Sequence, residues 1–183
     1  MQRDEAMELL NKHLTSDNLI KHSLAVEAIM RGLAEWLGED VEKFGLAGLL
    51  HDIDYDTTAD TPERHSLLGA IILEQNEIPE DIIYAVKVHN EMHGLERKSV
   101  MDHALYAADP VSGFITAVAL VRPDKKLEEV KLKSMKKKFK EKSFAQGASR
   151  DQMRLCSELG LELDEFLTIA LESMKKIAPD LDL

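Results

Sequence analysis

Apolar residues recur along most of the chain at intervals of three and four, which is the spacing of one face of an α-helix. Between residues 18 and 37, for example, Leu19, His22 and Val26 fall on one line, and Gly38 ends the segment. No stretch of useful length alternates between apolar and polar residues, as a half-buried strand would. The pattern therefore predicts an all-α protein.

The helix boundaries follow from N-cap residues, prolines and glycines. Thr61 and Pro62 have the order of an N-cap and a first helical residue. Ser99 and Asp102 have the spacing of a capping box, and Pro110 is expected to interrupt the helix that they open. The predicted helices cover residues 4–14, 18–37, 40–52, 61–73, 79–93, 99–109, 111–121, 127–140, 149–159 and 163–177.

The break near Pro123 is the best candidate for a boundary between two parts of the chain. At 183 residues, with a hydrophobic share of 44%, the chain fits one helical core with a small appendage. We therefore expect a metal-binding helical core over residues 1–122 and a lysine-rich helical extension over residues 123–183 that packs on it.

The net charge of −11 excludes general binding of nucleic acid or anionic membranes by the whole surface. The segment 125–142 is the exception, with nine lysines and three acidic residues. A solvated helix face accounts for such a run, and so does a basic surface that attracts a phosphorylated ligand. On the second interpretation, substrate phosphates bind four lysines on one side of the helix: Lys133, Lys136, Lys137 and Lys140.

Cys156 is the only cysteine, which excludes a disulfide framework and a cysteine zinc site and fits a reducing compartment. The N-terminus lacks the apolar region of a signal peptide, and the longest apolar run, residues 114–121, is too short to span a bilayer. We expect a soluble, cytoplasmic protein without membrane contact.

Histidines and aspartates lie on the apolar faces of five predicted helices. A single such histidine is more often a satisfied core residue than a ligand. Five helices that converge on one core can instead share a cation, which removes the cost of burying each polar group separately. Imidazole and carboxylate ligands together favour iron, manganese or zinc. Mg²⁺ and Ca²⁺ prefer sites made of oxygen ligands alone. The candidates are His22, His51, Asp52, His65, His89 and Asp109.

The order His, His-Asp, His, His, Asp on separate helices resembles the HD superfamily of metal-dependent phosphohydrolases. The segments 49–54 (LLHDID) and 104–109 (ALYAAD) strengthen the resemblance, which covers about residues 18–112. The ligand order is similar to that of the bacterial diadenosine-tetraphosphate hydrolase branch, and the chain also resembles small predicted HD hydrolases with a lysine-rich C-terminal extension. The resemblance implies an HD-domain helical bundle with a C-terminal helical extension.

The resemblance further implies one or two divalent metal ions, with Asp52 as the bridge between two of them. Iron or manganese is favoured, and zinc, nickel, cobalt and magnesium are the other candidates. His51 and Asp52 are the implied catalytic residues, and His93 and Asp102 lie within one or two helical turns of proposed ligands. The implied ligands of the first ion are His22, His51, Asp52 and Asp109, and those of the second are Asp52, His65 and His89.

The leading functional hypothesis is hydrolysis of a phosphate ester or anhydride by a metal-activated hydroxide. The substrate would be a nucleotide or another small phosphorylated metabolite. Some members of the superfamily with four histidines and two aspartates are mixed-valent di-iron oxygenases, which is a second hypothesis. A lysine often seen shortly after the His-Asp pair in that group is absent here, where residues 53–56 read IDYD. A non-catalytic, metal-stabilised regulatory module is the third, and the sequence leaves the oligomeric state open.

Overall fold

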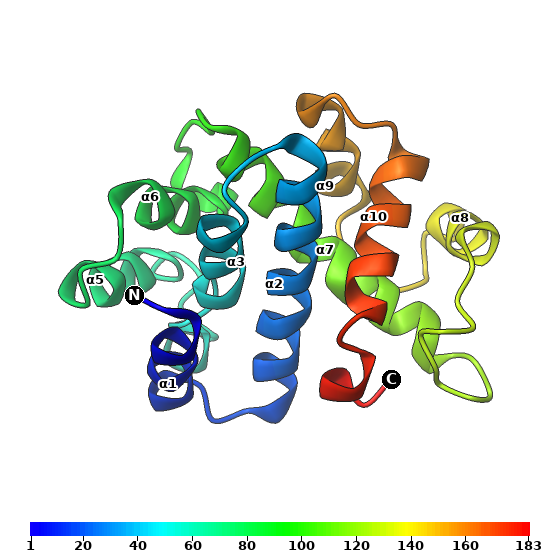
Figure 1. The fold of residues 1–183 in the computed structure, drawn as a ribbon, viewed down its shortest axis with the longest axis horizontal. Coiled ribbons are helices and arrows are strands. Elements are labelled where there is room, and N and C mark those ends of the chain that lie inside the picture. The colour runs from blue at the N-terminus through cyan, green and yellow to red at the C-terminus, as the bar shows by residue number, and fades with distance from the viewer.

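The computed structural model describes residues 1–183, and it confirms the all-α fold (Figure 1). Two long helices form its frame, α2 (Asp17–Leu37) and α7 (Val100–Leu120). One side of α2 packs against α3 (Val41–Leu50) and the other against α10 (Leu163–Lys175), while α7 crosses behind α2 and α10 in Figure 1. Shorter helices surround this frame.

The remaining elements are mostly one to three turns long. They are α1 (Arg3–His13), α4 (Tyr55–Thr58), α5 (Leu67–Gln75), α6 (Glu80–Val88), η1 (Glu91–His93), α8 (Leu132–Lys140), α9 (Arg150–Arg154), η2 (Leu155–Leu159) and η3 (Ala178–Leu181). None of the helices combines the length and the apolar composition that a membrane crossing requires.

The absence of a side chain at Gly48 allows α3 to lie directly against α2. A Cβ atom at this position would lie 2.8 Å from the carbonyl oxygen of Val26 and 2.9 Å from the backbone nitrogen of Glu27, which is closer than real Cβ contacts. The residues from 44 to 50 are all buried, so α3 is surrounded by protein after its first turn. This close contact fixes the end of α3, where the His-Asp pair follows.

The helix predicted from residue 61 begins at Leu67 instead. Ser66 has a left-handed backbone with a φ of 68°. The carboxylate of Asp54 accepts the backbone N–H groups of Ser66 and Gly69, each at 2.8 Å, and so caps α5 from outside the helix. A buried carboxylate distant in sequence thus replaces the local N-cap that the pattern predicts.

The helix predicted over residues 79–93 is also wrong, because it consists of two elements. The first, α6, ends at Val88, and His93 belongs to the separate turn η1. The side chain of Asn90 accepts the backbone N–H of Met92 at 3.1 Å and starts this new turn. His89 and His93 therefore do not share one helix.

Pro110 does not interrupt α7, which is continuous across it, so this predicted break is wrong. A proline inside a helix removes one backbone N–H donor. The residues around it, including Leu105, Phe114 and Ile115, are fully buried, and this packing holds the helix in one piece. The capping box predicted at the start of α7 is present, with the carboxylate of Asp102 accepting the backbone N–H of Ser99 at 3.0 Å.

One hydrophobic core joins early and late parts of the chain. Phe114 of α7 contacts Phe139 of α8 and Phe144 edge-on, with ring centroids 5.8 and 6.0 Å away. The thiol of Cys156 is buried in the same core. The lysine-rich helix α8 begins at Leu132 and not, as predicted, at residue 127. Residues 127–131 form turns and irregular chain. The boundary at residue 122 stays a prediction.

Candidate metal centre

The side chains predicted as ligands converge in one cluster, although they come from distant parts of the chain. The Nε2 atoms of His22 and His51 lie 3.2 Å apart, and those of His65 and His89 also lie 3.2 Å apart. Asp109 places Oδ1 at 3.2 Å from Nε2 of His22. The structure thus brings together the whole predicted set: His22 of α2, His51 and Asp52 after α3, His65 before α5, His89 after α6 and Asp109 of α7.

Asp52 lies between the two histidine pairs. Its Oδ1 atom is 3.3 Å from Nε2 of both His51 and His65 and 3.4 Å from that of His89. Its Oδ2 atom is 3.5 Å from Nε2 of His22. Metal–ligand bonds of about 2.1 Å place neighbouring ligands of one ion about 3.0 to 3.4 Å apart. The separations in the cluster match this spacing, and the position of Asp52 suits a bridging carboxylate.

Two of the histidines are oriented by the helices that they follow. The Nδ1–H group of His51 donates to the carbonyl oxygen of Gly48 at 2.9 Å, and that of His89 donates to the carbonyl oxygen of Val86 at 2.6 Å. The two histidines are the C-cap residues of α3 and α6. The negative ends of two helix dipoles therefore face the cluster, which favours a cation there.

The other two histidines are oriented by side chains. The Nδ1–H group of His65 donates to Oδ1 of Asp54 at 2.8 Å. The hydroxyl of Ser112 donates to the backbone carbonyl of Asp109 at 2.8 Å, so its oxygen accepts the Nδ1–H of His22 at 3.0 Å. Partners of this kind fix the tautomer and the ring orientation of metal-binding histidines.

Because every Nδ1 atom donates a hydrogen bond, every Nε2 atom of the neutral imidazoles carries a lone pair directed into the cluster. Two lone pairs at 3.2 Å repel unless a cation lies between them. Two sets of ligand atoms, His22 with His51 and Asp109, and His51 with Asp52 and His89, each lie within 4.8 Å of one another. The nitrogen and carboxylate donors fit a divalent transition metal, so the cluster can hold a metal ion.

The electrostatics of the cluster also call for positive charge. Burial disfavours the imidazolium form of His51, but the carboxylates of Asp52 and Asp109 outweigh burial and raise its pKa to about 9. The pKa of His65 is raised to about 10, because its bonds to Asp52 and Asp54 outweigh its burial. Burial raises the pKa of Asp52, but the surrounding histidines outweigh it and hold the pKa well below its usual value. Protons and metal ions therefore compete for one site.

The cluster opens to solvent on one side. The side chains of His51 and His89 are 0% and 3% exposed, whereas those of His22 and Asp109 are 24% and 32% exposed. A ligand would therefore approach from the His22 side, through a cavity of about 320 Å³. The cavity is lined by His22, Asp109, Pro110, Gly113 and small residues between positions 145 and 148.

Asp54 and Ser112 are functional candidates that sequence reasoning missed. The side chain of Asp54 is fully buried, although its sequence neighbours suggest an exposed acidic loop. The sequence offers one indication that Asp54 is buried: it directly follows the apolar residue Ile53. Ser112 lies three residues after Asp109, so helical spacing places both on one face of α7.

His93 and Asp102 were the predicted neighbours of the ligands. The Nε2–H group of His93 donates to the backbone carbonyl of His65 at 2.7 Å, so His93 supports the backbone of a candidate ligand. The carboxylate of Asp102 accepts the backbone N–H groups of Lys98 and Ser99 at the start of α7. Asp102 therefore caps the N-terminus of α7 and does not contact the cluster.

None of the four predicted phosphate-binding lysines lines the cavity at the opening. Lys133 and Lys137 line a different pocket beside α8. Lys136 forms an ion pair with Asp164 at 2.5 Å, and Lys140 is exposed at the end of α8. Their role in phosphate binding stays a prediction.

A comparison with protein families decides the relationship that the ligand order suggests. The model of the family described as HD domain matches residues 19–140. The chain belongs to the HD domain family. The matched range includes every candidate ligand, which confirms the resemblance to this superfamily of metal-dependent phosphohydrolases. The finer likeness to the diadenosine-tetraphosphate hydrolase branch stays a prediction.

Similar proteins include several named Ribonuclease Y. That of Nitratidesulfovibrio vulgaris is 37% identical over 98 residues, which are 54% of this HD protein and 18% of the relative. That of Aquifex aeolicus is 30% identical over 171 residues (91% and 30%), and that of Alkaliphilus metalliredigens is 29% identical over 184 residues (93% and 37%). The HD protein therefore spans only 18% to 37% of the length of these curated relatives.

Proposed function

We propose that this HD protein hydrolyses a phosphate ester or anhydride in a nucleotide or another small phosphorylated compound, and that His22, His51, Asp52, His65, His89 and Asp109 hold the metal. The observation that carries the proposal is the position of Asp52, within 3.5 Å of Nε2 of all four histidines. When bound, divalent metal ions supply a hydroxide nucleophile and stabilise the charge that develops at phosphorus.

The residues of the chain hold and orient the centre. The hydrogen bonds of the four Nδ1–H groups keep the Nε2 atoms directed inward, so little reorganisation is needed when a metal or a substrate binds. His22 and Asp109 are the most exposed of the candidate ligands and therefore the ones that an incoming phosphate meets. The bulk of the protein excludes water from the side of His51 and His89.

Hydrolysis of an RNA phosphodiester is a second candidate, because the similar proteins are named Ribonuclease Y. The same ligand set and the same attack on phosphorus serve both candidates, so the centre alone does not separate them. They differ in the length of the substrate and in the number of phosphate groups that the protein must bind away from the reaction.

The test is a hydrolysis screen in the presence of iron, manganese, zinc or magnesium. The panel contains mononucleotides, dinucleoside polyphosphates, sugar phosphates, bis(p-nitrophenyl) phosphate and single-stranded RNA. We compare wild type with His51→Ala and with His103→Ala, a matched change on α7 outside the cluster. Wild type and His103→Ala are expected to turn over at least one compound, and His51→Ala to lose at least about 100-fold of the rate.

Two outcomes would overturn the proposal in favour of the other hypotheses. If wild type hydrolyses nothing and shows the optical signature of a mixed-valent iron pair, the oxygenase hypothesis is favoured. If it binds metal stoichiometrically and performs neither reaction, a metal-stabilised regulatory module is favoured.

A further inference from the structure

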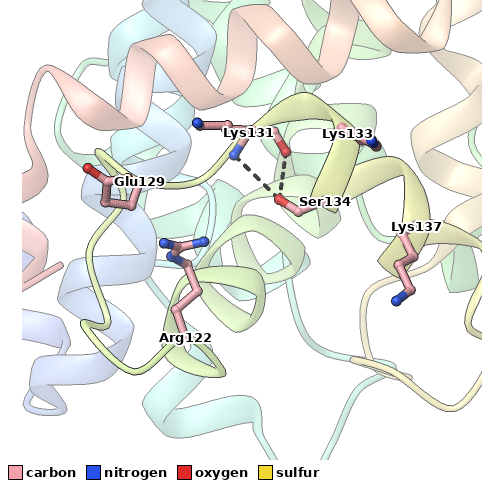
Figure 2. A pocket seen from close by; sticks show the side chains of 6 residues that line it. All are labelled: Arg122, Glu129, Lys131, Lys133, Ser134 and Lys137. Atoms are coloured by element: carbon pink, nitrogen blue, oxygen red, sulfur yellow. Dashed lines mark hydrogen bonds between the residues drawn. The ribbon is translucent and has the colours of Figure 1, made fainter.

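A pocket lined by charged and polar residues lies beside the start of α8, outside the candidate metal centre. The pocket has a volume of about 420 Å³. Figure 2 shows the side chains around it, which come from the turn after α7, from the segment before α8 and from α8 itself. The lining contains four cationic residues, one acidic residue and no apolar residue: Arg122, Lys131, Lys133, Lys137, Glu129 and Ser134.

The lysines of this basic pocket are free to bind a ligand. Lys131, Lys133 and Lys137 have no carboxylate oxygen within 4.0 Å, whereas Lys136 and Lys138 of the same helix are ion-paired. Lys133 and Lys137 lie four residues apart, so both project from one side of α8. Three unpaired ammonium groups around one cavity repel one another, and a bound anion would relieve this repulsion.

The backbone adds donors to the same pocket. The N–H groups of Leu132 and Lys133, the first two residues of α8, make no hydrogen bond within the chain. The hydroxyl of Ser134 donates to the backbone carbonyl of Lys131 and accepts the backbone N–H of Lys131, so its proton is not available to a phosphate. Free N–H groups at a helix start bind phosphate oxygens, and the helix dipole favours their charge.

The pocket is far from the metal centre. Arg122 follows Asp109 by thirteen residues along α7, which at about 1.5 Å per residue is about 20 Å. A single phosphate group cannot contact both sites. A single strand with about 3.4 Å per stacked nucleotide needs about six nucleotides to reach from one site to the other.

One face of α7 leads from the metal centre towards the end of the helix, which lies next to the basic pocket in the sequence. Asp109, Gly113, Thr116 and Leu120 are spaced by four, three and four residues and so lie on one face of the helix. Asp109 and Gly113 line the cavity at the metal centre, and the other two line a neighbouring cavity of about 380 Å³ that shares His22 and Gly113 with it. Leu120 ends this face two residues before Arg122.

The middle of this face suits the uncharged parts of a nucleotide better than its phosphates. Lys21 is the cation there, and it is already paired with Asp17 at 2.5 Å and Asp182 at 2.6 Å. Leu120 is 49% exposed and offers an apolar surface for a base or a sugar. Phosphate groups are therefore expected to be held at the two ends of this face.

Arg122 lines the basic pocket but is paired with Asp124 at 3.1 Å. We propose that the three unpaired lysines of the pocket, Lys131, Lys133 and Lys137, bind a backbone phosphate of a single-stranded polynucleotide whose reacting phosphodiester lies at the metal centre. The inference rests on the proposed phosphohydrolase function and deepens its second candidate, hydrolysis of an RNA phosphodiester, because it assigns the substrate to single-stranded polynucleotides. It also explains how a protein with a net charge of −11 attracts a polyanion through one local surface.

The test measures binding of RNA to the metal-loaded protein by fluorescence anisotropy. The probes are 12-nucleotide and 3-nucleotide single-stranded RNAs with phosphorothioate backbones that resist hydrolysis. The variant Lys131→Gln/Lys133→Gln removes two unpaired charges from the pocket. The control Lys12→Gln/Lys142→Gln removes two exposed, unpaired lysines elsewhere, so the net charge of the two proteins is the same. Thermal unfolding checks that both variants are folded.

We expect the 12-nucleotide RNA to bind wild type at least about tenfold more tightly than the 3-nucleotide RNA. The pocket variant should make the slope of log K against log salt shallower by about 0.7, the value for one lost phosphate contact with a single strand, and the control should leave the slope near that of wild type. Equal binding of both lengths, an equal loss in the control, or displacement of the long RNA by equimolar tripolyphosphate would each overturn the inference.

The failure of this inference differs from the failure of the proposed function. Hydrolysis of bis(p-nitrophenyl) phosphate by wild type needs only the metal centre and reports on the proposed function alone. If wild type cleaves this ester and the pocket variant binds RNA as tightly as wild type does, the proposed function stands and the polynucleotide inference is wrong.

Discussion

The buried carboxylate of Asp54 accepts the Nδ1–H of His65 at 2.8 Å, and with its other oxygen it accepts the backbone N–H groups that start α5. One side chain therefore orients a candidate ligand and fixes the helix that follows it. The orientation of His65 and the geometry of the 62–66 turn are coupled through this single residue.

Asp54→Asn should lower metal affinity by roughly 10- to 100-fold, the usual effect of losing a partner of a metal-binding histidine. The carboxylate accepts three N–H donors, and an asparagine places an NH₂ group against at least one of them. The measurement is a competition titration with a chromophoric chelator. Asp60→Asn, an exposed change in the same segment, is the control and should leave affinity unchanged. Equal affinities of both variants would contradict the coupling.

Asp52→Ala should release all bound divalent metal, whereas Asp109→Ala should keep the ion that His65 and His89 hold. The reason is that Asp52 contacts both histidine pairs, whereas Asp109 contacts only His22 and His51. Elemental analysis of proteins purified without chelator gives the metal content per chain. Retention of the wild-type content by Asp52→Ala would show that the cluster is not the metal site.

The metal-free protein should lose stability as pH rises. The pKa values of His51 and His65 are raised to about 9 and about 10 in the folded protein, above the ordinary value of 6.5. Their contribution is therefore complete below pH 6.5 and disappears as pH rises through 9 and 10. Thermal unfolding of chelator-treated protein between pH 6.5 and pH 9.5 measures it, with a loss of about 2 to 4 °C for each kcal/mol. Saturating Mn²⁺ should flatten this dependence, because the metal replaces the protons. An unfolding temperature that stays constant or rises without metal would contradict the prediction.

Gly48→Ala should destabilise the fold by about 1 to 3 kcal/mol, because its methyl group would overlap the backbone of α2 at Val26. It should also weaken metal binding, since the carbonyl of Gly48 holds His51. Gly113→Ala is the matched control: a Cβ atom there meets nothing within 4 Å, and alanine should stabilise α7 by about 0.5 to 1 kcal/mol. Urea unfolding of both variants gives the two free energies. A Gly48→Ala protein as stable as wild type would mean that α3 can move away from α2 without cost.

The sequence predicts the helical class and the residues that meet in the cluster because both depend on local spacing. The apolar period reveals the helices, and the polar residues on their buried faces reveal His22, His51 and Asp109. The turn before α5 depends instead on Asp54, whose carboxylate reaches Ser66 and Gly69 across the fold. No local pattern contains such a long-range cap.

Pro110 and the lysines show the same limit. A proline predicts a break from local geometry, but burial of the residues around it keeps α7 continuous. The lysines of α8 share one side of a helix, as predicted, yet only the fold shows that this side faces Arg122 and not the opening at His22. Periodicity gives the face of a helix, whereas tertiary packing decides what that face meets.

The acceptors of the four Nδ1–H bonds are of two kinds, backbone carbonyls that no substitution removes and side chains that a single substitution can remove. His51 and His89 donate to backbone carbonyls, which remain whatever side chains the neighbouring positions carry. His65 and His22 donate to Asp54 and Ser112, which single substitutions can change. Substitutions at these two positions therefore change how His65 and His22 are held while the backbone partners of His51 and His89 stay in place.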